Sequence, residues 1–428
     1  MGLFKQHEKR QRARRALIAL SGLLVTSLSI SACAPAKQAD SNAVHDRLLV
    51  LDSHLDTPIV LDRPGFDITR RHDALIDYAQ VDLPRMREGG LDGGFWVIYT
   101  PQGALTAKGY ANALAHARHR NRLIDKMLAA HGDHFAAALR ADDAAAIAAQ
   151  GKRIVYKSIE NAYPVGEDIS RLDEFYAAGV RMVGLVHMAN NQFADSATDP
   201  AGPKWGGLSL LGKALIRRAN QLGMIVDLSH AHDAALQQAI ELSTTPVILS
   251  HSGAAALYAH PRNVNDALLR DLAASGGVMH INSLSGYLKK LDTDSARRPA
   301  LVALFRYWRQ NPPQTEADTK AFLEARRAID AQYRPDFASL DDVMAHIFHA
   351  GDIMGAAHIG IGLDWDGGGG VDGLHDIAAL PAITARMRAA GISDKAIGQM
   401  WSGNVLRLLR LAENARRASP ETEKNTGK

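Results

Sequence analysis

Histidine and carboxylate residues follow short apolar segments at several places along the chain. His54 and Asp56 come directly after the first of them, Leu48–Asp52, which reads as a buried strand. In an extended strand residues i and i+2 point to the same side, so both side chains can reach one metal ion. A His-x-Asp pair is common by chance and alone fits a surface turn, so its meaning depends on the other segments.

Five more apolar segments end in a residue of metal-ligand or acid–base type. A hydrophobic strand has no folding reason to end in such a residue, and burying one without a partner is costly. The repetition therefore indicates one shared site at the ends of several strands. The residues concerned are Glu160, His187, His230, His251 and Asp364.

The residue types indicate the class of metal and of reaction. Histidines combined with carboxylates favour borderline ions such as zinc over calcium or magnesium. Five ligands exceed the three protein ligands usual for one catalytic zinc, so we expect two ions with a carboxylate between them. Two such ions can hold a hydroxide and polarise a carbonyl group, which suits hydrolysis of an amide.

The elements that must position these residues alternate between strand and helix. Gly179, Gly223 and Gly276 stand where a helix should end and a strand begin. Eight strands alternating with helices predict an α/β fold, a TIM (β/α)8 barrel, whose active site lies at the carboxyl ends of the strands. The predicted strands are Leu48–Asp52, Gly94–Tyr99, Arg153–Glu160, Met182–His187, Ile225–His230, Val247–His251, Val278–Asn282 and Ile359–Asp364.

The stretch between the seventh and eighth strands is too long for one connecting helix. Three helices are predicted there, at Arg298–Arg309, Glu316–Gln332 and Leu340–Ala350. The last is the regular helix before strand eight. The first two form a helical insertion within residues 283–338, which could border or cover the site.

The N-terminus has the layout of an export signal. Basic residues precede an apolar run, Ala16–Ile30, that is short for a membrane span of about 20 residues. Small residues then lead to Cys33, the only cysteine, which resembles the lipidation site of bacterial lipoproteins; an ordinary signal peptide is the alternative. We therefore predict a lipoprotein signal peptide at 1–33, a linker at 34–46, a metal-dependent hydrolase barrel at 47–415 and a polar tail at 416–428.

The net charge and the export signal indicate which partners and which compartment to expect. Residues 1–33 carry six basic and one acidic side chain, so the rest of the chain has a net charge of −2 against +3 for the whole. The basicity belongs to the export signal, and no nucleic-acid partner is expected. The predicted location is the bacterial cell envelope, with the protein lipid-anchored at the outer membrane or the periplasmic face.

The ordered motifs resemble those of a known family, the membrane (renal) dipeptidases, peptidase family M19. The resemblance runs from about Leu48 to about Leu409, and the order and spacing of the motifs make it specific. The motifs are Asp52-Ser53-His54-Leu55-Asp56, Ser158-Ile159-Glu160-Asn161, Leu185-Val186-His187, Asp227-Leu228-Ser229-His230, Ser250-His251-Ser252, Arg262-Asn263-Val264, Gly360-Ile361-Gly362-Leu363-Asp364-Trp365-Asp366-Gly367 and Gly403-Asn404-Val405-Leu406-Arg407.

The resemblance implies a role for each metal ligand. His54 and Asp56 would bind one zinc ion, His230 and His251 the other, and Glu160 would bridge the two. It implies a zinc-dependent dipeptidase with two Zn2+ per chain, whose bridging hydroxide attacks the peptide bond of dipeptides, including those with an L and a D residue.

The same resemblance assigns the remaining catalytic and substrate-binding residues. His187 would contact the substrate and stabilise the oxyanion, and Arg262 would bind the carboxylate of the dipeptide. Asp364 would accept a proton from the attacking water and pass it to the leaving amine. A homodimer is compatible with the resemblance.

Two other functions compete with this hypothesis. Another barrel amidohydrolase, such as a lactonase or phosphotriesterase, typically opens with His-x-His and bridges its metals through a modified lysine, whereas this chain has His54–Asp56 and Glu160. A non-catalytic peptide- or metal-binding lipoprotein could lose ligands freely, yet every ligand position is filled.

Three residues depart from the pattern of the family. Ser53 and Leu55 stand where the family commonly has Gly and Asn; they flank the first ligands and leave metal binding intact, and Leu55 is expected to alter the pocket wall. His280 stands on strand seven where an apolar residue is expected, and we interpret it as a core residue rather than a functional group.

Overall fold

The structure, a computed structural model, describes residues 42–292 and 296–417. Eight parallel strands follow one another around a sheet in chain order. All eight coincide with the predicted strands, shifted by a few residues at their ends. They are β1 (Leu51–Leu55), β2 (Gly93–Tyr99), β4 (Arg153–Glu160), β5 (Val180–Gly184), β6 (Ile225–Asp227), β7 (Ile248–Ala254), β9 (Val278–Ile281) and β10 (Ile359–Ile361).

The sheet closes into a barrel just beyond β10. Leu55 forms a parallel bridge with Trp365, and the backbone N–H of Leu363 donates to the carboxylate of Asp52 at 3.0 Å. The first and last strands therefore meet at a seam next to His54. The predicted TIM barrel is confirmed.

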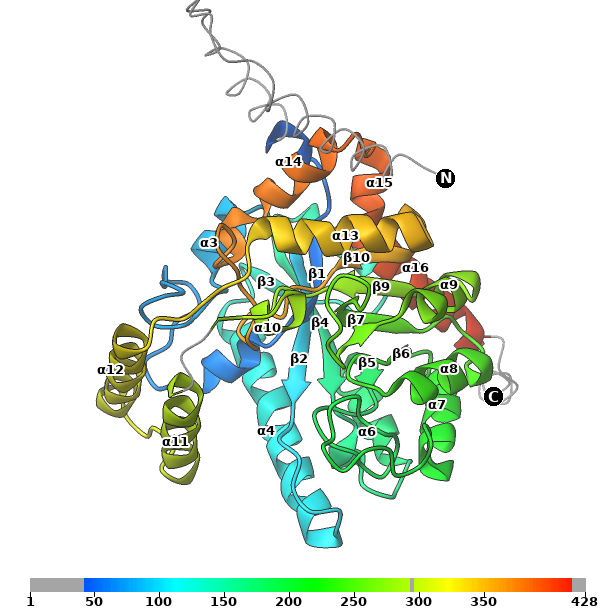
Figure 1. Cartoon of the computed structure of the whole chain (residues 1–428), viewed down its shortest axis with the longest axis horizontal. Coiled ribbons are helices and arrows are strands. Elements are labelled where there is room, and N and C mark those ends of the chain that lie inside the picture. The colour runs from blue at the N-terminus through cyan, green and yellow to red at the C-terminus, as the bar shows by residue number, and fades with distance from the viewer. Residues whose placement is uncertain (1–41, 293–295, 418–428) are drawn as a thin grey trace, which may run out of the picture.

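Helices surround the barrel; most connect successive strands, and the last three follow β10 (Figure 1). Gly223, where the sequence predicts the end of a helix, adopts the left-handed conformation (φ 75°) that ends the helix Leu210–Leu222. The helices in this layer are α4 (Ala107–Ala130), α5 (Asp143–Ala148), α6 (Arg171–Ala177), α7 (Leu210–Leu222), α8 (Asp233–Leu242), α9 (Asp266–Ala274), α13 (Leu340–Met354), α14 (Pro381–Ala389), α15 (Asp394–Gly398) and α16 (Asn404–Arg417).

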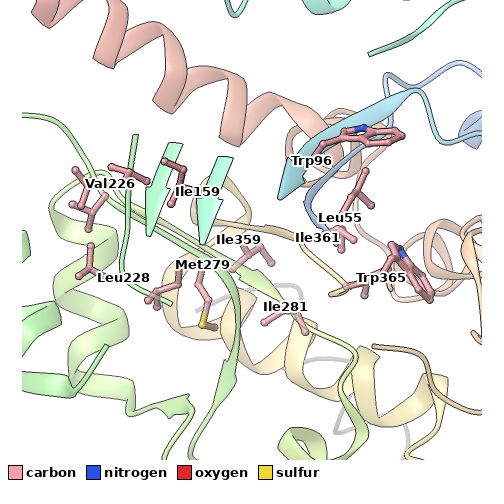
Figure 2. Packing of buried hydrophobic residues seen from close by; sticks show 14 of the residues in the cluster. Leu55, Trp96, Ile159, Val226, Leu228, Met279, Ile281, Ile359, Ile361 and Trp365 are labelled. Atoms are coloured by element: carbon pink, nitrogen blue, oxygen red, sulfur yellow. The ribbon is translucent and has the colours of Figure 1, made fainter. Parts of the chain in front are cut away.

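Apolar residues pack both outside and inside the barrel. The larger cluster lies between strands and helices; Figure 2 shows Leu55 beside Trp96 in this layer, and both are fully buried. Leu55 therefore lies in the core, and the prediction that it alters the pocket wall is wrong. The second cluster joins the starts of the strands, for example Leu51 and Ile225, to Leu409 of α16.

The predicted insertion between the seventh and eighth barrel strands is present as two helices, α11 (Arg297–Gln310) and α12 (Glu316–Gln332). They stand apart from the barrel in Figure 1, and neither contains a fully buried residue. Tyr78 ties them to the barrel: its hydroxyl donates to Asp330 of α12 at 2.8 Å, and its ring lies 3.7 Å from the guanidinium of Arg326.

The ends of the chain differ in part from the predicted boundaries. Residues 42–45 form a helical turn in which Val44 and His45 are buried, so the last residues of the predicted linker belong to the folded domain. The predicted signal peptide and Cys33 lie outside the described residues, as does most of the predicted tail. Among the residues that the structure describes, no helix has the length and apolar character that crossing a membrane requires.

Short elements complete the fold. Sequence periodicity did not predict them because each has six residues or fewer. They are η1 (Thr57–Asp62), α3 (Leu83–Glu88), β3 (Phe135–Ala137), β8 (Asn263–Val264) and α10 (Ser285–Leu288).

Candidate metal centre

The barrel gathers the predicted ligands at the carboxyl ends of its strands. His54 lies within β1, Glu160 ends β4 and His251 lies within β7. His230 and Asp364 follow β6 and β10 and have positive φ angles of 69° and 62°. Residues other than glycine rarely adopt this conformation, and such strain concentrates at functional sites.

Glu160 lies at the centre of the cluster, and its two carboxylate oxygens face different ligands. Oε2 lies 3.5 Å from Nε2 of His54, whereas Oε1 lies 3.1 Å from Nε2 of His230 and 3.5 Å from Nε2 of His251. A carboxylate with one oxygen toward each group of ligands has the arrangement of a bridge between two ions.

Two further carboxylates, those of Asp56 and Asp364, lie beside His54. The ligand atoms of His54, Asp56 and Asp364 lie within 4.8 Å of one another, and all three residues are buried. Nε2 of His54 is 3.5 Å from Oδ2 of Asp56. The same nitrogen of His54 thus lies 3.5 Å from a carboxylate oxygen of Asp56 and 3.5 Å from one of Glu160.

The cluster fits a metal site by the chemistry of its unpaired atoms. Nε2 of His54 and Oδ1 of Asp56 are buried without a hydrogen-bond partner among the described residues. Nε2 of His230 and Nε2 of His251 face each other at 2.9 Å beside the Glu160 carboxylate. Buried polar atoms that converge in this way need a common partner, and imidazole nitrogens with carboxylate oxygens suit zinc.

The charges in the cluster shift the pKa values in opposite directions. Burial would raise the pKa of Glu160, but the neighbouring His54 and His187 hold it well below its usual value. Burial would lower the pKa of His54, and the Glu160 and Asp56 carboxylates raise it instead. The pKa of Asp364 is raised by burial and by the charges of Asp56 and Glu160.

His187 also joins the cluster. Its Nε2 lies 3.5 Å from Oε1 of Glu160, and the ring of Tyr99 meets it edge-on with centroids 5.0 Å apart. Unlike the other histidines it is partly exposed, with 22% of its side chain accessible. A side chain in this position can contact both the site and a bound ligand.

Arg262 approaches the cluster from the side of His230 and His251. Its Nη2 donates to the backbone oxygen of His251 at 2.9 Å, and the guanidinium lies over the ring of Tyr287. Its Nε is buried without a hydrogen-bond partner among the described residues. The guanidinium therefore retains a free donor, which suits a carboxylate ligand.

The sequence analysis did not identify Ser250 and Asp227, two buried residues that support the ligand His251. The hydroxyl of Ser250 donates to Asp227 and accepts from the ring of His251 at 2.9 Å. Both residues stand in motifs singled out for the histidines that follow them. A polar residue at a position that should face the inside of the barrel was the available signal.

His280 lies in the core of the barrel wall, which agrees with its interpretation as a core residue. It is fully buried, and its Nδ1 donates to the backbone oxygen of Ile361 at 2.9 Å. Burial lowers its pKa to about 4. A neutral imidazole in the barrel wall is consistent with a core residue.

The sequence matches known dipeptidases over most of its length. The family model described as membrane dipeptidase (peptidase family M19) matches residues 38–423. The chain is 32% identical to dipeptidase tcpJ of Claviceps purpurea, covering 82% of this chain and 73% of that protein. It is 30% identical to dipeptidase aclJ of Aspergillus oryzae, covering 82% and 74%.

Solved structures of bacterial proteins share the fold. The probable dipeptidase PvdM from Pseudomonas aeruginosa has a TM-score of 0.75 and 28% identity, covering 89% of this chain and 99% of that one. A metallopeptidase from Rhodobacter sphaeroides, liganded with a phosphinate mimic of the dipeptide L-Ala-D-Ala, has a TM-score of 0.66 and 25% identity. It covers 85% of this chain and 99% of that chain.

Proposed function

The chain belongs to the membrane dipeptidase family, peptidase family M19, and is a metal-dependent hydrolase of dipeptides; on this basis we propose that it uses two zinc ions held by His54, Asp56, Glu160, His230 and His251. The observation that carries the proposal is the central position of Glu160. Its Oε2 faces His54 and its Oε1 faces His230 and His251. One carboxylate can therefore serve two ions, with His54 and Asp56 completing one site and the two later histidines the other.

The bound ions would lower the pKa of a water molecule and polarise the scissile carbonyl group. Asp364 lies beside His54 and Asp56 and accepts the proton that the attacking water loses. It then donates this proton to the nitrogen of the leaving amine, so the products are two amino acids.

Two further residues bind the substrate. His187, the partly exposed histidine beside Glu160, donates to the carbonyl oxygen as negative charge develops on it. Arg262 binds the terminal carboxylate through its free donors. A carboxylate bound at a fixed distance from the scissile bond gives a physical reason for cleaving dipeptides rather than long chains.

The test is metal content and hydrolysis measured on the same preparation. Protein lacking residues 1–33 should contain two zinc ions per chain and cleave L–L or L–D dipeptides; the Rhodobacter relative binds a mimic of an L–D dipeptide. A chelator should abolish cleavage, and Glu160→Gln should lose both metal and activity. Two zinc ions without dipeptide cleavage would redirect the search to other amides or lactones. A protein that binds no metal and stays inactive after zinc is added would overturn the proposal.

We also propose that the enzyme is a lipoprotein of a bacterial cell envelope, attached through Cys33 to the outer membrane or the periplasmic face. The support is the sequence order of a basic start, an apolar run and small residues before the only cysteine. Expression of the whole chain in a bacterial host with a labelled fatty acid should label the protein, whereas Cys33→Ser should not be labelled. Equal labelling of both would overturn the anchor.

A further inference from the structure

A large cavity separates the barrel mouth from the inserted helices. Its volume is about 1820 Å³. One wall belongs to the barrel and includes Ile59 of η1, and the opposite wall is formed by α11 and α12. This is far more space than two alanine residues would fill, so the cavity can accommodate a bulky part of a substrate.

Two residues that line the cavity also adjoin residues of the metal centre. Gly367 lines it, and a methyl group added at this glycine would overlap the carboxylates of Asp56 and Asp364. Tyr99 also lines it, and its ring contacts His187. A ligand at the metal centre can therefore extend into the cavity past Gly367 and Tyr99.

The position of Arg262 decides which end of a dipeptide extends there. Arg262 binds the backbone beside His251, whereas the cavity adjoins Asp56 and Asp364. Glu160 lies between His251 and His54. With the carboxylate at Arg262 and the scissile bond near Glu160, the amino-terminal residue points toward the cavity.

The far wall of the cavity carries an aromatic cluster among charged side chains such as Arg309 and Arg326. Phe305 and Trp308 of α11 and Phe322 of α12 line it, with ring centroids of 6.1 Å for Phe305–Phe322 and 5.8 Å for Trp308–Phe322. Phe305 is 40% exposed, and neither helix buries any residue fully. An aromatic cluster left open to a cavity gains free energy when an apolar group covers it.

We propose that α11 and α12 form a specificity pocket for a large aromatic side chain on the amino-terminal residue of the dipeptide. This inference rests on the proposed function and adds the substrate class. The link of Tyr78 to Asp330 and Arg326 holds the aromatic wall in place relative to the barrel. The wall can thus stack against an aromatic ring while the peptide bond lies at the metal centre.

The test compares dipeptides that differ only in their first residue. The zinc-loaded enzyme should cleave L-Phe-D-Ala with a kcat/KM ~10-fold above that for L-Ala-D-Ala, as expected when an aromatic group enters an apolar pocket. Trp308→Ala and Phe322→Ala should each lower kcat/KM for L-Phe-D-Ala by ~10-fold and change that for L-Ala-D-Ala less than ~2-fold. The L–L pair with the same side chains should show the same difference.

Val302→Ala is the matched control. Val302 lies on the same helix, is 48% exposed and does not line the cavity, so its truncation should leave both rates unchanged. Equal cleavage of both dipeptides, or equal effects of Trp308→Ala on both, would overturn the specificity pocket alone. Absence of cleavage of every dipeptide would instead overturn the proposed function, and the pocket with it.

Discussion

The hydroxyl of Ser250 donates a hydrogen bond to Oδ2 of Asp227 at 2.6 Å, and both residues are buried inside the barrel. The serine oxygen is then free to accept from Nδ1 of His251 at 2.9 Å and from Nδ1 of His54 at 3.5 Å. A proton on Nδ1 leaves the Nε2 lone pair of each ring directed at the metal centre. One hydroxyl thus orients a ligand from each of the two proposed zinc sites.

Replacing Ser250 by alanine should weaken metal binding. Loss of a partner that orients a metal-ligating histidine typically costs ~10–100-fold in affinity. Zinc affinity of Ser250→Ala, measured by competition with a chelator, should fall by this amount at both sites. Ser252→Ala on the same strand is the control, because the Ser252 hydroxyl has no hydrogen-bond partner among the described residues. Equal affinities in the two variants would contradict the role of Ser250.

Replacing Arg262 by lysine should impair recognition of the substrate carboxylate. Lysine keeps the positive charge but lacks the planar donors of the guanidinium. KM for L-Ala-D-Ala should rise ~10–100-fold, the size of a lost bidentate ion pair, with a smaller change in kcat. The wild type should discriminate against the dipeptide amide, and the variant should do so less. If both enzymes discriminate equally, the carboxylate is bound elsewhere.

Replacing Gly367 by alanine should damage the metal centre. The added methyl group would overlap the carboxylates of Asp56 and Asp364, which cannot move far because both are buried. Misplacement by ~1 Å near the reacting atoms can cost ~100-fold in rate, so kcat/KM should fall by at least this factor. Gly398→Ala is the control, since its added methyl group would meet Leu48 at 3.5 Å, an ordinary contact. Full activity in Gly367→Ala would show that the loop adapts.

His280 should make stability depend on pH. Its pKa is about 4 in the folded protein because burial disfavours the imidazolium ion, against about 6.5 for a histidine exposed to water. Above pH 6.5 it is neutral in both states. As pH falls from 6.5 to 4, the unfolded chain binds a proton that the folded chain does not, and up to ~3 kcal/mol of stability is lost.

Urea denaturation of the same metal-loaded protein between pH 7.5 and 4.5 measures this loss. His280→Val removes the titrating group, so its stability should fall by ~2–3 kcal/mol less over this range than that of the wild type. Other histidines titrate in both proteins and cancel in the comparison. Parallel curves for the two proteins would mean that His280 is protonated when folded.

Periodicity and strand-end chemistry predicted the barrel and brought the predicted ligands to one place. The strands were recognisable because residues such as Val226 and Ile248 belong to short buried apolar segments bounded by glycine and polar residues. The ligands were recognisable because a histidine or carboxylate at the end of such a segment has no role in packing. Both signals are local in sequence.

Most of the remaining features depend on contacts between distant segments. The prediction for Leu55 failed for a local reason, because side chains alternate along a strand and Leu55 lies on the opposite face from His54 and Asp56, packed in the core. The partnership of Ser250 with His54 joins residues 196 positions apart. The cavity depends on how α11 and α12 sit relative to the barrel, and amphipathic spacing within a helix does not specify this.

The seam of the barrel lies next to the metal centre. Asp52 accepts from the N–H of Leu363, 311 positions further along the chain, and from the N–H of His54. Asp364 therefore reaches His54 and Asp56 only after the last strand has joined the first. A nascent or shortened chain that ends before β10 can carry all five proposed zinc ligands and still lack the residue that moves the proton. The chain thus becomes a competent enzyme only once its last strand has closed the barrel.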